Sequence, residues 1–388
     1  MFNPTAQEPP HKKREEEEAL LSSIPDAVAL SIFARVSRLD HAALSLVSPR
    51  YRSLVVSPDL YTTRSLMGCT EMSLYVCLSS PPPGPVTTRW LICRLGKPRD
   101  AKNMTTNRLC LLPSSPSQPS ESSVVVLEWG IYVIGGKING KNTSSVLVLD
   151  CRTHKWHQVS SMGVARASAA AGVVDGKIYV SGGCKDMDSW DPKTQSWNIL
   201  PSPGWNQSHD LIRGSVVVDD NLYAVNKGGN SVYYSPNEGK WGKGELLYCC
   251  DTMGYLFWCE AEKLKCHESE GMVWTKVKGL KTLRRNVSGY DSRSRTVPFD
   301  GEIEELPTSY TFEAGVSKLS NFGGNIVVFW DIVVVGLNEG LEIWCAEISL
   351  ERREPGEIWG KIEWSEAVMT TDPLLYSPEV LHSVSVNI

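Results

Sequence analysis

The chain has 388 residues, 41% of them hydrophobic and 21% charged, which is typical of a globular protein with room for two or three domains. Because 39 Lys and Arg face 44 Asp and Glu, there is no basic excess to neutralise a phosphate backbone, and we expect no nucleic-acid partner. The most apolar run, Ile326 to Val335, is about half of the ~20 residues that a membrane helix needs, so we expect no membrane association.

Cysteine usage and composition indicate the compartment and divide the chain. The eleven cysteines are an odd number without paired spacing, and the N-terminus is polar where a secretory signal is apolar. These features predict reduced thiols in the cytoplasm or the nucleus. Residues 1–21 carry short charged runs and few apolar groups, which predicts a disordered tail. Residues 1–70 hold one of the 31 glycines and none of the 13 tryptophans, so a β-rich region is expected only after them.

The segment after residue 22 has the periodicity of short helices. Pro25 suits the first turn of a helix, and Val28, Ile32 and Val36 recur at four-residue spacing. Asp40 is a candidate cap for a second helix, and a third short helix follows. A helical unit of about 45 residues is too small to bury one comfortable core, so part of its apolar surface is expected to need a partner.

The same residues form an ordered motif. It runs through Ile24-Pro25-Asp26, Ile32, Val36, Leu39-Asp40, Leu44 to Ser48, Tyr51-Arg52, Leu54 and Ser57 to Leu60. Over residues 22–66 this motif resembles an F-box, with Ile24 in place of the usual leucine and Pro49 in place of the usual lysine, which leaves the start of the third helix open. The F-box family uses this face to bind the Skp adaptor of a cullin-based ubiquitin ligase. The resemblance therefore implies adaptor contacts by Ile24, Pro25, Asp26, Ile32, Val36, Leu44, Val47 and Tyr51.

Beyond residue 69 the sequence repeats a unit of apolar strand, turn, strand ending in Gly-Gly, third strand ending near Asp, and Trp. Two copies are complete, and their marker residues are Gly135, Gly136 and Trp156, then Gly182, Gly183 and Trp197. Trp241 continues the spacing, and periods of 40 to 50 residues with four strands each are typical of propeller blades. The glycine pairs suit positive φ angles, and the tryptophans suit the wedge between blades.

Fainter copies extend the count to about six blades. They begin near Val216, Leu247 and Phe322, and Ser73 to Leu111 supplies one more upstream. The segment Val380 to Val386 alternates as an exposed edge strand does, and we expect it to complete a blade begun at the other end of the propeller. Two departures predict one or two degenerate blades. Only 8 residues separate Gly183 from Asp191, which predicts a shortened third strand, and residues 284–318 are expected to be an insertion or a degraded blade.

The repeats resemble kelch repeats, and the whole order resembles the plant family of F-box/kelch-repeat proteins. The expected fold is therefore a small all-α F-box domain at 22–68 followed by an all-β kelch propeller at 69–388. In that family the propeller recognises a target protein and the F-box delivers it for ubiquitination and proteasomal degradation.

Motifs for other chemistry are weak. Gly135 to Asn142 approximates a phosphate-binding loop, but no helix is expected after it, so a hairpin loop is the interpretation. Cys249, Cys250, Cys259, Cys266 and His267 lack the spacing of a zinc site, and no nucleophile motif is present. We therefore expect no metal, no cofactor and no enzymatic activity.

A binding surface remains the interpretation of the propeller. The loops that enter the first strand of each blade gather near the channel mouth, and they carry Arg166, Ser168, Trp205, His209 and Arg213. These are candidate target contacts, although Arg166 and Arg213 equally suit links between neighbouring blades. Two rival functions stay open: an interaction scaffold with a vestigial F-box, and an enzyme that uses the channel mouth.

Overall fold

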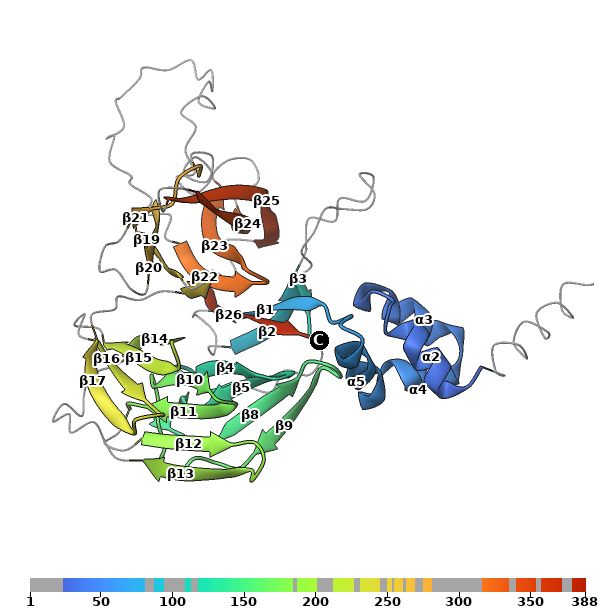
Figure 1. The fold of residues 1–388 in the computed structure, drawn as a ribbon, viewed down its shortest axis with the longest axis horizontal. Coiled ribbons are helices and arrows are strands. Elements are labelled where there is room, and N and C mark those ends of the chain that lie inside the picture. Colours follow the sequence, from blue (N-terminus) through green and yellow to red (C-terminus); the bar gives the residue numbers. More distant parts are fainter. Residues whose placement is uncertain are drawn as a thin grey trace, which may run out of the picture. The chain divides into compact units, whose positions relative to one another are not determined.

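The chain divides into two compact units in the computed structural model (Figure 1). The helical unit comprises residues 1–71 with Asn387 and Ile388, and the propeller comprises Met72–Val386. The structure describes residues 24–80, 87–93, 109–112, 118–183, 187–200, 212–226, 231–244, 250–252, 255–260, 263–268, 275–280, 316–334, 340–353, 357–371 and 379–388. The predicted tail at 1–21 and most of the predicted insertion at 284–318 lie outside these ranges.

Short helices make up the helical unit. They are α2 (Asp26–Phe33), the 3₁₀ helix η1 (Arg38–Asp40), α3 (His41–Val47), α4 (Pro49–Val55) and α5 (Pro58–Leu66). Pro49 does not displace α4, because it occupies the first helical position while the Ser48 hydroxyl accepts a hydrogen bond from the Tyr51 amide at 3.1 Å. Asp40 precedes α3 as predicted, but its side chain makes no capping hydrogen bond.

A buried arginine ties the helical unit together. Arg64 of α5 is fully buried and donates from Nη1 to the carbonyl oxygens of Ala34 and Val36 at 3.0 and 2.8 Å. Its Nη2 lies 3.3 Å from the Glu71 carboxylate. Because these carbonyls follow the last turn of α2, the guanidinium links the C-terminal end of α2 to α5 and to the chain at residue 71.

Six four-stranded sheets form the propeller within the described ranges. In order from the innermost strand, they are β26 (Glu379–Asn387), β1 (Met72–Ser80), β2 (Thr87–Cys93) and β3 (Leu109–Leu111); β4 (Ser123–Leu127), β5 (Gly130–Ile134), β8 (Val146–Asp150) and β9 (Lys155–Val159); β10 (Ala170–Val174), β11 (Lys177–Ser181), β12 (Met187–Asp191) and β13 (Ser196–Leu200); β14 (Ile212–Val218), β15 (Asn221–Asn226), β16 (Ser231–Ser235) and β17 (Lys240–Gly244); β18 (Cys250–Thr252), β19 (Tyr255–Glu260), β20 (Lys263–Glu268) and β21 (Thr275–Lys276); and β22 (Val316–Phe322), β23 (Asn325–Val334), β24 (Gly340–Arg353) and β25 (Glu357–Thr371).

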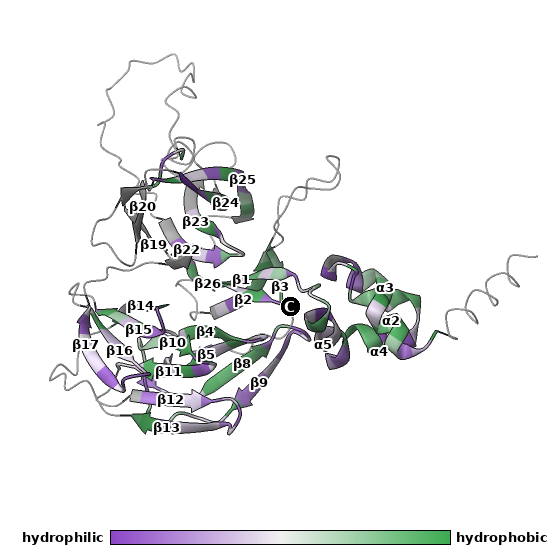
Figure 2. Ribbon diagram, viewed as in Figure 1, coloured by the Kyte–Doolittle hydropathy of each residue, from purple (hydrophilic) through white to green (hydrophobic). Residues whose placement is uncertain are grey.

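Hydrophobicity falls from the inner strands of a blade to its outer strand. Every residue of β5 is buried, whereas β9 alternates between exposed and half-buried residues, and the ribbon coloured by hydropathy shows the same contrast between β8 and β9 (Figure 2). Central strands are covered on both faces by neighbouring blades, and outer strands face solvent. None of the helices in the described ranges combines the length and apolar character needed to cross a bilayer.

The predicted shortening of the third strand in the second complete repeat is wrong. Strand β12 has five residues, the same length as β8, and pairs with β13 over its whole length. The extra residues of the first repeat form a small separate hairpin, β6 (Lys137–Ile138) and β7 (Lys141–Asn142), so the difference in spacing reflects a loop and not a strand. This hairpin is also what the loop between Gly135 and Asn142 was predicted to be.

The glycine pair at Gly135–Gly136 permits close backbone packing. Both residues have positive φ, +60° and +101°, and a Cβ atom added to Gly135 would lie 2.5 Å from the carbonyl oxygen of Arg166. A Cβ on Gly136 would lie 2.6 Å from the Ser120 carbonyl oxygen. Only glycine fits both the conformation and the space, which explains why the repeat keeps this pair.

The strand at the C-terminus closes the ring. Strand β26 pairs with β1 and is the innermost strand of its sheet, where the sequence pattern had predicted an exposed edge. The Ser320 hydroxyl of β22 donates to the Ser383 carbonyl of β26 at 2.8 Å, and residues of the two blades share one buried apolar cluster. Since each blade also contacts the next, with β18 touching both β14 and β22, no sheet is left with an uncovered inner edge.

Aromatic side chains fill the spaces between blades. The rings of Tyr132 and Trp190 lie 5.1 Å apart across the second and third sheets, and Trp197 packs against the same cluster. Trp156 lies 6.4 Å from Trp90 of the first sheet. Trp241 packs against Ala170 of the third sheet as well as residues of its own. Flat rings bury large areas in a wedge-shaped space, which accounts for their recurrence.

Candidate protein-binding surfaces

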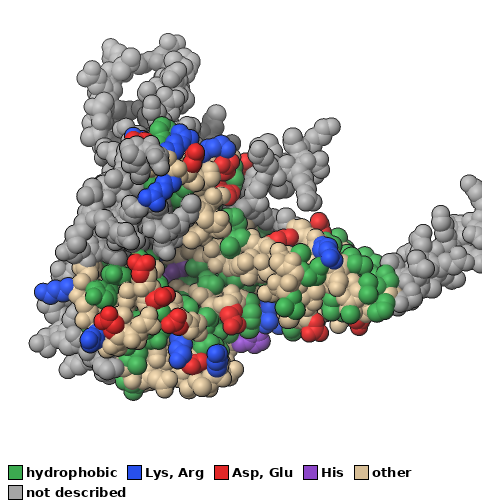
Figure 3. Space-filling model, viewed as in Figure 1, with side chains coloured by type: hydrophobic (Ala, Val, Ile, Leu, Met, Phe, Trp, Pro, Cys, Tyr) green, Lys and Arg blue, Asp and Glu red, His purple; other side chains and the backbone are tan. Residues whose placement is uncertain are grey.

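Exposed apolar side chains gather on the helical unit. Val28 and Ile32 of α2 are each 49% exposed, and Leu46 and Val47 at the end of α3 are 79% and 54% exposed. We call these four residues the apolar surface. Figure 3 shows hydrophobic side chains covering much of the visible face of the helices. Val28 and Ile32 are four residues apart and share one face of α2. Exposed apolar residues that gather in this way mark a protein-binding site.

Polar groups hold the start of α2 beside this surface. The Asp26 carboxylate accepts a hydrogen bond from Arg50 Nε at 2.9 Å, and Arg50 also donates to the carbonyl of Ile24. Pro25 and Asp26 are exposed, as an adaptor contact requires. These bonds fix the entry to α2 against α4 and orient Pro25 without covering it.

The other residues predicted to contact the adaptor are less accessible. Ile24, Val36 and Leu44 are half-buried, and Tyr51 is buried against Phe33 with their rings 4.9 Å apart. Tyr51 therefore supports the helices from beneath. Val28 and Leu46 were missed as candidates, although both lie within the motif, and the signal that identifies them is exposure rather than residue type.

In the propeller, Arg166 is buried and held in an ion pair. It lies between β9 and β10 with 1% of its surface exposed, and its Nη2 is 3.0 Å from the Asp188 carboxylate of β12. Its Nη1 donates to the Gly182 carbonyl at 2.9 Å, while its own carbonyl accepts from the Gly136 amide at 2.7 Å. Arg166 thus joins the second and third sheets, which favours the blade-linking alternative over contact with a target.

Ser168 lies at the rim of the channel in a charged cluster. Its hydroxyl donates to the Glu121 carboxylate at 2.8 Å, and Glu121 forms an ion pair of 2.8 Å with Lys137 of the β6–β7 hairpin. The neighbouring Ile138 is 50% exposed. We call Glu121, Lys137, Ile138 and Ser168 the rim cluster. It combines both charges with an exposed apolar side chain, a composition that suits a protein interface. Glu121 and Lys137 were not among the predicted site residues.

The remaining predicted contacts lie outside the described residues. Trp205 and His209 fall between 201 and 211, and Arg213 belongs to β14 by its backbone while its side chain is not described. The side chains of Cys249, Cys250, Cys259, Cys266 and His267 are also outside the described set.

Small capped helices with an exposed apolar surface, followed by a closed propeller with Gly-Gly and Trp markers, define an F-box protein of the kelch class. The F-box domain model matches residues 21–63, and the FKB95 kelch-repeats domain model matches residues 90–369. An F-box/kelch-repeat protein of Arabidopsis thaliana is 36% identical over 94% of this chain and 93% of its own. A putative F-box/kelch-repeat protein of the same plant is 36% identical over the whole of both chains, and another is 37% identical over 89% of each.

The chain therefore belongs to the F-box/kelch-repeat family. Proteins of this family act in general as substrate adaptors of Skp–cullin–F-box ubiquitin ligases and not as enzymes, and membership gives this chain the same general role.

Proposed function

We propose that the apolar surface of the helical unit binds the Skp adaptor of a cullin ubiquitin ligase, and that the propeller presents a target protein to that ligase. One observation carries the first half. Six of the nine large apolar side chains that are exposed within the described ranges belong to the helical unit, which is much the smaller of the two. A soluble unit with so much exposed apolar area gains stability when a partner covers it.

Covering the apolar surface has a sizeable energetic effect. A buried Leu, Ile or Val side chain contributes about 1.5–3 kcal/mol relative to an exposed one, so four half-exposed side chains supply several kcal/mol toward binding. Exposed Pro25 and Asp26 stand at the edge of this surface, where polar contacts provide specificity.

The rim cluster is the proposed docking point for the target. It lies where the loops of the second and third sheets meet, and Ser168 also accepts a hydrogen bond from the Ile212 amide of the fourth sheet through its carbonyl. Three blades therefore fix this region, and rigid scaffolds that present varied loops are a common basis for recognition. We place the protein in the cytoplasm or the nucleus, where the ligase machinery acts.

Titration of the purified adaptor against the full chain tests the first half. The double variant Ile32→Asp, Leu46→Asp is expected to weaken adaptor binding at least 100-fold, because two charges would be buried in an apolar interface. Ile199→Asp is the matched control, since Ile199 is 65% exposed on the propeller and its replacement is expected to leave binding unchanged. Circular dichroism establishes that all variants remain folded. A wild-type chain that fails to bind the adaptor would overturn the proposal and favour a scaffold with a vestigial F-box.

Target delivery is tested in cells with the proteasome blocked. Proteins that accumulate on the wild-type receptor are compared with those on the Ile32→Asp, Leu46→Asp variant. A true target is expected to bind both receptors and to carry ubiquitin only with the wild type. Target ubiquitination that is equal with the variant would show that delivery does not depend on the apolar surface.

A further inference from the structure

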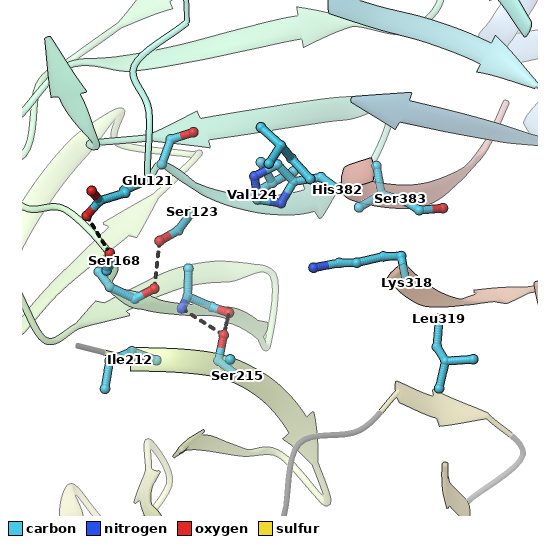
Figure 4. A pocket seen from close by; sticks show the side chains of 16 residues that line it. Glu121, Ser123, Val124, Ser168, Ile212, Ser215, Lys318, Leu319, His382 and Ser383 are labelled. Carbon is cyan, nitrogen blue, oxygen red and sulfur yellow. Dashed lines mark hydrogen bonds between the residues drawn. The ribbon is translucent and has the colours of Figure 1, made fainter. Parts of the chain in front are cut away.

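The propeller contains a cavity on its axis. It has a volume of about 440 Å³ and is lined by residues of β4, β10, β14, β22 and β26, the innermost strands of five blades (Figure 4). Cavities that hold small molecules typically measure about 300–1,000 Å³ and combine apolar walls with a few polar groups. This cavity has both features, so its polar groups decide what it accepts.

Some of those polar groups are already used by the fold. The Ser123 hydroxyl donates to the Ala169 carbonyl at 2.6 Å, and the Ser215 hydroxyl donates to the Ala171 carbonyl at 2.9 Å, so both serines join neighbouring blades. The Glu121 carboxylate, the one acidic group among the lining residues, is occupied by Lys137 and Ser168. Its negative charge is therefore compensated at the rim.

Lys318 and His382 are the other ionisable groups of the lining. The Lys318 side chain extends from β22 into the cavity, and His382 lies on the opposite wall on β26 (Figure 4). Burial and then the positive charge of Lys318 lower the pKa of His382 to about 3. The imidazole is therefore neutral at pH 7 and offers one donor and one acceptor, while the ammonium of Lys318 makes the interior positive.

A buried hydroxyl beside them lacks a hydrogen bond. Ser383 is 8% exposed, and its Oγ has no partner among the described residues. An unsatisfied buried hydroxyl costs about 1–3 kcal/mol, and such groups are usually completed by a ligand or an ordered water. Ser383 therefore adds a second observation, independent of charge, that the cavity is built to hold something polar.

We propose that this cavity binds a small organic anion. Its carboxylate or phosphate group accepts hydrogen bonds from the Lys318 ammonium, its other polar groups bond to His382 and Ser383, and its carbon skeleton packs on Leu319 and Val124. A bound anion would join β22, β26 and β4, and so stabilise the blade interface at which the ring closes. The site is independent of the proposed adaptor surface, since every lining residue belongs to the propeller.

Calorimetric titration of the full chain at constant ionic strength tests the proposal, with citrate and glycerol 3-phosphate as probes and trimethyl citrate as the uncharged counterpart. Saturable binding of at least one anion and none of the ester is expected. Lys318→Met keeps the length of the side chain, removes its charge and should weaken anion binding at least tenfold. Lys177→Met is the matched control, because Lys177 lies on β11 outside the cavity, and its affinity should equal that of the wild type.

Ser383→Ala separates a ligand site from a water-filled channel. It should weaken anion binding about three- to tenfold while leaving the thermal unfolding midpoint of the free protein unchanged or raised. Absence of saturable binding by both anions, or equal affinity in Lys318→Met and the wild type, would overturn the proposal. Adaptor binding measured on the same variants should be unaffected, so failure here is distinguishable from failure of the proposed function.

Discussion

The helical unit and the propeller solve the problem of burying apolar residues in opposite ways. The helical unit buries a few residues around Phe33 and Leu60 and leaves Leu46 and Leu66 at 79% and 84% exposure. The propeller is large enough to cover its sheets with one another, and only Leu111, Ile138 and Ile199 are large apolar residues exposed among its described residues.

The difference shows which unit depends on a partner. A ring of sheets completes itself, because each blade covers the next and β26 covers the last inner edge. A unit of five short helices has too little volume to do the same, so its surface is available for an adaptor. The four predictions below test this contrast between a self-sufficient ring and a partner-dependent helical unit.

The largest effect is expected from removing β26. A chain that ends at residue 378 loses the strand that pairs with β1, together with the buried side chains of Val380 and Val386. The inner edge of the first sheet becomes open, and we expect no cooperative unfolding transition in urea. Tryptophan fluorescence is the measurement, since all 13 tryptophans lie beyond residue 70 and report on the propeller alone.

Removal of Asn387 and Ile388 alone is the control for this truncation. It spares β26 from Glu379 to Val386 and should leave the fluorescence transition intact. If the longer truncation unfolds at the same urea midpoint as the full chain, ring closure is not what stabilises the propeller.

The second prediction concerns the buried ion pair. Arg166→Ala leaves the Asp188 carboxylate buried with no positive partner, and its Oδ1 already lacks a hydrogen bond within the described residues. The expected loss is about 3–5 kcal/mol in the free energy of unfolding of the propeller. Lys177→Ala, which breaks the exposed pair with Asp191, should cost about 1 kcal/mol or less.

A double variant shows where that energy resides. Replacing both partners, as in Arg166→Met, Asp188→Leu, should recover most of the loss, because no uncompensated charge remains. If the double variant is no more stable than Arg166→Ala, the guanidinium's bonds to the backbone matter more than its charge.

The sequence predicted the order of elements well, because repeats and capped helices are local patterns. The Gly-Gly pairs, the Trp spacing and the alternating strand near the C-terminus depend on backbone conformation and on short-range periodicity, which are visible in the chain itself. Kelch repeats and the F-box are also the features that the family models match.

Side-chain environment was harder to predict, because it depends on residues far along the chain. Nothing near Arg166 indicates that Asp188, 22 residues away, would take its guanidinium. The β6–β7 hairpin accounts for residues that otherwise suggested a longer third strand. Leu46 and Tyr51 belong to one motif, yet one is exposed and the other is in the core, because α3 and α4 turn different faces toward the interior.

The third prediction uses the two buried histidines, one in each unit. Burial first, and then the charges of Arg64 and Arg38, lower the pKa of His41, while burial and Lys318 lower the pKa of His382 to about 3. In both cases the unfolded chain, with a pKa near 6.5, takes up the proton before the folded one. Their contribution to stability is therefore complete above about pH 6.5 and is lost as the pH falls toward the folded pKa, by at most about 1.4 kcal/mol per pH unit for each group.

Urea unfolding between pH 7.5 and 4.5 measures both histidines separately. Fluorescence follows the propeller, where His382→Gln should flatten the pH dependence. Helical ellipticity at 222 nm follows the helical unit, where His41→Gln should do the same. A fluorescence midpoint with the same pH slope in wild type and His382→Gln would show that His382 does not titrate with unfolding.

The smallest effect is expected at the cap of α4. Ser48→Ala removes the hydroxyl that accepts a hydrogen bond from the Tyr51 amide, and the expected cost is about 1 kcal/mol in the stability of the helical unit. Since the propeller does not depend on this cap, its fluorescence transition should not move, while amide exchange in α4 should accelerate about fivefold. Adding saturating adaptor should remove most of that difference in exchange, because binding stabilises the folded helices by mass action. If exchange in α4 stays equally fast with the adaptor bound, the helical unit does not rely on its partner for stability, and the contrast between the two units fails at its weaker side.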